Sequence, residues 1–118
     1  MKNIVASLLE EARLSQHSES SRILAKNEDI RIVAVARMSK DETPALLLEV
    51  AVILNPSETV DLDKLNRKMT LLKELESRGH VLSCQDESII FCDIPTSEDS
   101  VLVDLKTIKQ IINIHNLM

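Results

Sequence analysis

Apolar side chains recur along this chain with two different periods, and the changes of period predict where helices and strands lie. Residues 3–14 and 61–78 carry apolar positions three or four residues apart, which is the period of an amphipathic helix. The chain from about residue 98 to near its end has the same period. The runs 30–38 and 45–54 are short, apolar and rich in β-branched residues, which is typical of strands.

Alternation along residues 30–38 assigns one face of that strand to the core. This face is purely apolar and consists of Ile30, Ile32, Ala34, Ala36 and Met38. The turn-forming stretch SKDETP separates the run from 45–54 and predicts a hairpin. The weaker segment 21–26 is either a further strand or the end of the first helix. The turn residues Asn27–Asp29 that follow it favour a strand.

The stretch HVLSCQDESIIFCD, residues 80–93, predicts a second hairpin and holds both cysteines of the chain. A two-residue loop would pair Val81 with Cys92 and place the two cysteines on opposite faces. A three-residue loop would pair Leu82 with Cys92 and place Cys84 on the same face as Cys92, as diagonal neighbours. Neither register puts the thiols directly opposite each other, so we expect no disulfide.

The same hairpin raises the question of a metal site. His80, Cys84 and Cys92 are candidate ligands, but tetrahedral zinc would need a fourth ligand such as His115. Free cysteines usually act as small apolar core residues, and this interpretation accounts for the pattern without any chemistry. We therefore expect neither a metal nor a cofactor.

Gly79 is the only glycine in the chain and directly follows the helical pattern of 61–78. It occupies the position where a left-handed residue commonly ends a helix, and we interpret it as such a stop signal. The scarcity of glycine also excludes glycine-rich phosphate-binding loops.

His17 lies in a serine-rich stretch without a nucleophile elbow. We expect no enzymatic activity.

Together the elements predict a single α+β domain over residues 1–118, in the order α-(β)-β-β-α-β-β-α, with an antiparallel sheet of four or five strands.

The formal net charge is −5, which argues against binding to a phosphate backbone. We interpret a local basic strip as a solvated strand face; it consists of Arg22, Lys26, Arg31 and Arg37. Without a signal peptide or membrane segment, and with two cysteines, the chain is expected to be cytoplasmic.

Apolar residues cover more of the last helix than one core-facing stripe requires. The surplus predicts a homodimer or a bound chain, although a mobile N-terminal segment could also cover it. Candidate self-association residues are Ile111, Ile114, Leu117 and Met118. Separately, Val33, Val35 and Leu47 on the strands are candidates to receive a partner segment by strand addition.

The closing part of the chain resembles type III secretion chaperones and related small α+β domains of bacteria. The resemblance lies in the order of the helix LLKELESRG, the hairpin HVLSCQDESIIFCDIP and the helix after it, and covers about the last sixty residues. It implies a cytosolic, usually homodimeric domain that works through protein–protein contacts. The near absence of aromatic residues departs from that pattern.

The sequence thus favours a non-enzymatic protein-binding module, chaperone- or adaptor-like, with a homodimer and a protein or peptide partner. The alternative is a regulatory domain that binds a small ligand or a metal through His80, Cys84 and Cys92. We expect no nucleic-acid and no membrane partner.

Overall fold

Within residues 2–54, 62–83 and 88–118, which the computed structural model describes, helices and strands follow the predicted order. The elements are α1 (Lys2–Leu14), β1 (Glu19–Lys26), β2 (Ile30–Met38), β3 (Pro44–Ile53), α2 (Leu62–Leu75), β4 (His80–Ser83), β5 (Ile89–Thr96) and α3 (Val101–Ile114). The segment 21–26 is therefore part of a strand, and the predicted α+β fold is confirmed.

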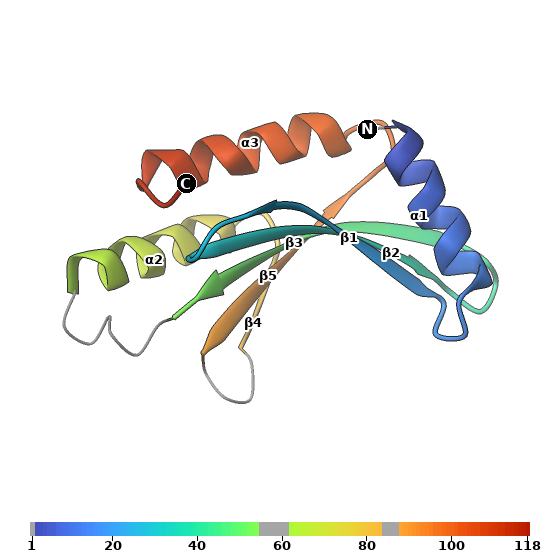
Figure 1. Ribbon diagram of the computed structural model, residues 1–118, viewed down its shortest axis with the longest axis horizontal. Coiled ribbons are helices and arrows are strands. Elements are labelled where there is room, and N and C mark those ends of the chain that lie inside the picture. Colours follow the sequence, from blue (N-terminus) through green and yellow to red (C-terminus); the bar gives the residue numbers. More distant parts are fainter. Residues whose placement is uncertain (1, 55–61, 84–87) are drawn as a thin grey trace.

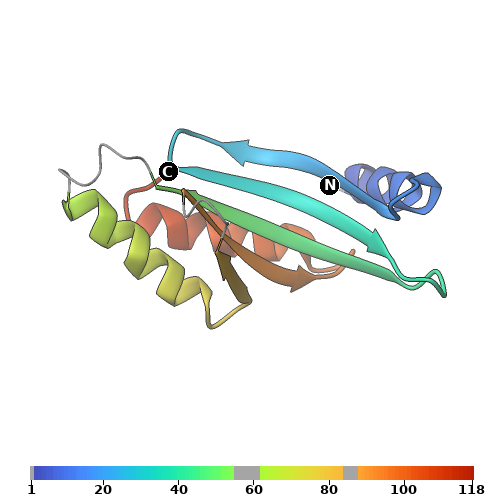
Figure 2. The same cartoon turned by 90° about the horizontal axis from the view of Figure 1, so that it is seen from below.

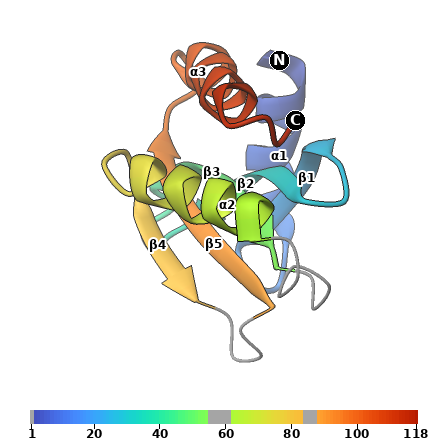
Figure 3. The ribbon, with the colours of Figure 1, turned by 90° about the vertical axis from the view of Figure 1, so that its left-hand side faces the viewer.

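The five strands form one antiparallel sheet in the order β1-β2-β3-β5-β4. The first three strands form a meander, and β5 returns to pair with β3, which leaves β4 at the far edge. Figure 1 shows α1 and α3 on the same side of the sheet, and Figure 3 shows α2 next to α3. All three helices contribute to one apolar core against that side.

The core has the composition that the alternation of β2 predicts. Ile30, Ile32, Ala34 and Ala36 are buried in it, and Met38 packs against its margin. β3 contributes every second residue, and the helices add aliphatic stripes; these residues are Leu46, Leu48, Val50, Val52, Val5, Leu8, Leu71, Leu75, Ile108 and Ile112. Aliphatic residues thus fill the space between sheet and helices without a single aromatic ring.

α3 begins later than the sequence pattern indicates. Ser97–Ser100 form a turn instead of the first helical turn, in which the Val101 N–H donates to the Ser97 carbonyl at 2.9 Å. The N-cap is Ser100. The Thr96 hydroxyl instead donates to the Asp104 carboxylate at 2.6 Å, which joins the end of β5 to α3.

A buried ion pair fixes α2 to the end of the sheet. Lys68 has no exposed surface, and its Nζ lies 3.0 Å from Asp29 Oδ1 in the β1–β2 turn and 2.5 Å from the Ile53 carbonyl of β3. Lys64 Nζ lies 3.0 Å from the other oxygen of Asp29. Burial raises the pKa of Asp29, but the hydrogen bonds and charges of Lys68 and Lys64 outweigh it and hold the pKa below its usual value.

Gly79 does not have the left-handed conformation expected of a helix stop signal. No described glycine has a positive φ. Gly79 instead lies where β4 meets β5, and a Cβ there would collide with the Asp93 carbonyl and lie 2.9 Å from Ile94 Cγ1. Close approach of two strands, and not backbone conformation, therefore explains this glycine.

Candidate protein-binding surface

Among the described residues, no helix covers one face of the sheet. Figure 2 looks onto the strands from below, with α3 behind them. Because side chains alternate along each strand, the residues between the core positions point to this side. We call this side the uncovered face; its main residues are Ile23, Arg31, Val33, Val35, Leu47, Glu49, Ala51, Phe91 and Asp93. Val33, Val35 and Ala51 lie outside the core cluster.

The predicted partner-binding residues come together on this face. Val35 pairs directly with Leu47 across β2 and β3, and Val33 lies two positions along the strand. Neighbouring side chains shield both valines, while Ile23, opposite Val33 on β1, is 55% exposed. The exposed apolar surface of this face thus extends onto β1, where no partner-binding residue was predicted from the sequence. The missed signal was the alternation of Ser21, Ile23 and their neighbours, which is weak because the strand is polar.

Two carboxylates face each other in the middle of the uncovered face. Glu49 of β3 is directly opposite Asp93 of β5. Burial raises the pKa of Glu49, and the charge of Asp93 raises it further, while Arg31 and Arg37 act in the opposite direction. The centre of the face is therefore a half-buried acidic pair whose repulsion Arg31 and Arg37 offset in part, an arrangement suited to a further cationic group of a partner.

Replacing Glu49 with glutamine is expected to stabilise the protein at neutral pH. Because the pKa of Glu49 is raised on folding, its protonation favours the folded state; that contribution is complete below the unfolded pKa and is lost as pH rises through the folded pKa. Removing the charge should raise the free energy of unfolding at pH 7 by about 0.5 kcal/mol, the scale for like charges opposite each other in a sheet. Urea unfolding at pH 4 and pH 7 measures the effect.

In the exposed control Glu76→Gln, we expect no such change between the two pH values. Equal stability of Glu49→Gln and the wild-type protein at pH 7 would contradict the repulsion between Glu49 and Asp93.

The outer edge of β1 is open to another strand. β1 pairs with β2 on one side, and no strand of the described chain pairs with its other side. An edge strand of eight residues presents unpaired N–H and C=O groups, which a partner segment can satisfy. A register shift between Ile23 and Ala25 limits regular pairing to the first part of the strand.

The second hairpin adopts the register of the two-residue loop. Val81 pairs with Cys92, and His80 pairs with Asp93. Cys92 is buried on the helix side, with its Sγ 3.6 Å from the Leu75 carbonyl. Because adjacent residues of a strand face opposite sides, His80 lies on the other face, and His80 and Cys92 cannot share a metal. Cys84 lies outside the described residues.

His115 and the Cys92 thiol also bear on the alternative of a metal site. His115 Nε2 lies 2.6 Å from Glu74 Oε2, on the α2–α3 side of the molecule. The described residues contain no group of three or more His, Cys, Asp or Glu side chains arranged to hold a metal. Burial raises the pKa of the Cys92 thiol to about 11, with the charges of Asp93 and Glu76 adding to the effect. Cys92 is thus a small core residue, as predicted, and a poor nucleophile.

The four predicted self-association residues divide into two pairs. Ile111 and Leu117 are 6% and 3% exposed and belong to the core. The chain turns back after α3, and the Asn27 side chain donates to the Leu117 carbonyl at 2.9 Å, which fixes that turn. Ile114 and Met118 are 73% and 39% exposed. Only these two of the four are available to a partner.

The basic strip of the sequence is partly neutralised. Arg22 lies 3.1 Å from Glu11, and Arg37 lies 2.9 Å from Glu19. Arg31 is half-buried beside the acidic pair. These contacts reduce the positive charge that the strip could offer to a polyanion.

No family model, no curated protein and no solved structure matches the chain. The resemblance to type III secretion chaperones therefore stays an expectation based on element order. Of the helices in the described ranges, none has the length and apolar character needed to cross a bilayer.

Proposed function

We propose that this chain is a non-enzymatic protein-binding domain, chaperone- or adaptor-like, that holds a segment of a partner protein on the uncovered face and at the edge of β1. The observation that supports this most is the placement of all three helices on one side of the sheet. On the opposite side Ile23 is exposed and Leu47 is half-buried, with Val35 buried beside Leu47. Sheets of this kind commonly bury such a face against another element.

The chemistry of the face defines the partner segment. An extended strand added to β1 would pair its backbone with the open edge and direct alternate side chains toward Ile23 and Leu47. A basic residue of the partner would meet Glu49 and Asp93 and relieve their mutual repulsion. The expected segment is therefore extended and apolar, with at least one Lys or Arg.

The double change Ile23→Glu with Leu47→Glu is expected to abolish partner binding, because it places two charges where apolar side chains must be buried. Purified wild-type and variant proteins serve as bait in native lysate, and captured proteins are quantified by mass spectrometry. The matched control is Leu62→Glu, an exposed leucine on α2 away from this face. The proposal predicts a stoichiometric partner captured by wild type and control and lost from the double variant.

Two outcomes would contradict the proposal. One is capture of the same partner by the double variant as by the wild-type protein. The other is a blank from well-folded bait at a concentration at which moderate affinities are detected.

We further propose that the domain is a homodimer of the cytoplasm. Ile114 and Val103 are exposed about three turns apart on the same side of α3, Met118 is exposed after the helix, and the free Cys92 thiol fits a reducing compartment. Ile114→Asp should therefore shift the protein from dimer to monomer in sedimentation velocity, because a carboxylate would be buried in the dimer contact. Ile111 is unsuitable for this test, since its substitution would disrupt the core. An unchanged dimer would place the contact elsewhere.

A further inference from the structure

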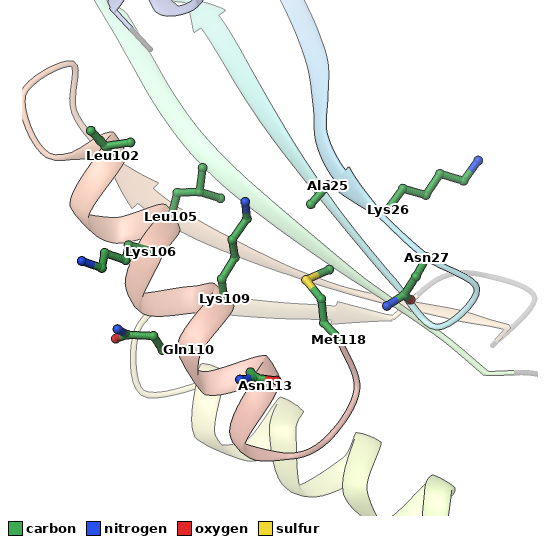
Figure 4. Close-up of a pocket in the computed structure, with 10 residues that line it drawn as sticks. All are labelled: Ala25, Lys26, Asn27, Leu102, Leu105, Lys106, Lys109, Gln110, Asn113 and Met118. Carbon is green, nitrogen blue, oxygen red and sulfur yellow. The ribbon is translucent and has the colours of Figure 1, made fainter.

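A groove runs between the last residues of β1 and the exposed side of α3. Its volume is about 940 Å³, within the range of small-molecule sites. The groove is lined by Ala25, Lys26, Asn27, Leu102, Leu105, Lys106, Lys109, Gln110, Asn113 and Met118. Residues 102–113 of α3 give it a length of about 16 Å at the rise of an α-helix. It lies on the helix side of the sheet and is separate from the uncovered face (Figure 4).

The lining is cationic in an otherwise acidic chain. Three of the lining residues are lysines, and none is an aspartate or glutamate, although the chain carries a net charge of −5. Within the described residues, no ion pair is formed by Lys26, Lys106 or Lys109. Figure 4 shows the Lys109 side chain reaching into the groove, whereas those of Lys26 and Lys106 point away from it. The ammonium group of Lys109, with no acidic residue in the lining, favours an anionic occupant over a cationic one.

The inner part of the groove is apolar. Leu105 and Ala25 form opposite walls, and the exposed side chains of Leu102 and Met118 extend the apolar surface along the groove. Figure 4 shows Lys109 and Met118 reaching from the α3 side into the space toward β1. A positive charge thus lies beside an apolar channel, which suits a molecule with a charged end and an apolar chain.

We propose that this groove binds a fatty-acid anion, with the carboxylate at Lys109 and the acyl chain along Ala25, Leu102, Leu105 and Met118. A peptide strand fits less well here. The backbone groups of α3 are bonded within the helix, and the pairing of β1 is already interrupted between Ile23 and Ala25. A peptide backbone in the groove would leave polar groups without partners, whereas an acyl chain has none to satisfy. This inference does not depend on the proposed function.

Calorimetric titration of delipidated protein with decanoate and with decanol, both below their aggregation concentrations, tests the assignment. We expect saturable 1:1 binding of decanoate, about tenfold tighter than decanol, because a charge-assisted contact is lost in the alcohol. Lys109→Gln should remove the preference for the acid, and Lys26→Gln, at a side chain that points away from the groove, should retain it. Leu102→Ser should weaken binding of both ligands alike. Lys73→Gln, an exposed lysine of α2, is the matched control and should bind as wild type does.

Absence of saturable decanoate binding would overturn the assignment, as would equal affinity for acid and alcohol or an unchanged preference in Lys109→Gln. Sedimentation of the same variants distinguishes another occupant. If Leu102→Ser dissociates a dimer and decanoate has no effect, a second copy of the chain covers the groove and the assignment fails. If an acidic peptide binds and decanoate does not, the groove is a protein-binding site and the assignment also fails.

Discussion

Replacing Lys68 with methionine is expected to lower the free energy of unfolding by about 3 kcal/mol, the scale for breaking a buried ion pair. The Lys68 side chain is fully buried and bonds both to Asp29 and to the Ile53 carbonyl. Methionine fills much of the same volume, so lost packing contributes little. The cost arises because Asp29, itself 7% exposed, keeps a charge that, among the described residues, Lys64 alone would balance.

The pH dependence of this loss provides a second measurement. The folded pKa of Asp29 is depressed, so the ion pair stabilises the fold above the unfolded pKa of about 3.9 and this contribution is lost as pH falls through the folded pKa. The stability difference between wild type and Lys68→Met should therefore shrink in acid. Because the chain has no Trp or Tyr, urea unfolding is best followed by far-ultraviolet circular dichroism.

Two further variants interpret the result. Lys73→Met, on the exposed side of the same helix, should change stability by less than about 0.5 kcal/mol. Combining Lys68→Met with Asp29→Asn should recover part of the loss, since no unpaired charge remains buried. A loss below about 1 kcal/mol for Lys68→Met, or one that is independent of pH, would show that the pair does not hold α2 in place.

Replacing Gly79 with alanine is expected to destabilise the protein by about 3 kcal/mol, because the new methyl group would overlap the Asp93 carbonyl and approach Ile94. Both neighbours belong to β5, which is paired on both sides and cannot move alone. A left-handed stop signal would instead lose only about 1 kcal/mol on the same change. The size of the effect thus separates the two interpretations of this glycine.

Urea unfolding of Gly79→Ala is compared with that of Arg78→Ala, a change at the neighbouring exposed position. Arg78→Ala should be almost neutral. If Gly79→Ala were neutral or stabilising, the lower entropy of the unfolded chain would be the dominant effect, and the close contact with β5 would be disproved.

The sequence predicts the elements of this fold well where burial follows a simple period. Strand 30–38 is the clearest case, because its core face contains no polar residue. The periodicity failed to identify Lys68, since a lysine in a helical stripe is ordinarily solvated and only the three-dimensional approach of Asp29 explains its burial. Ile111 and Leu117 were misjudged for a related reason. The return of the chain after α3 covers them, and nothing local in the sequence encodes that turn.

The candidate binding surface was only partly predictable. Val33, Val35 and Leu47 follow from alternation, yet the absence of a helix over them depends on where three helices pack. The groove was not foreseen, because its walls come from β1 and α3, which lie far apart in sequence. Lys109 is unremarkable in the sequence and becomes informative only because it reaches into this cavity.

The sheet order also has a consequence for how the chain folds. The β1–β2–β3 meander pairs neighbours in sequence, so it needs only short loop closures. The connection from β3 to β5 is long because it contains α2 and β4. β5 can pair with β3 only when this long loop has closed. We therefore expect two cooperative units on the folding pathway, with the meander and α1 gaining hydrogen-exchange protection first and the β3–β5 seam closing last.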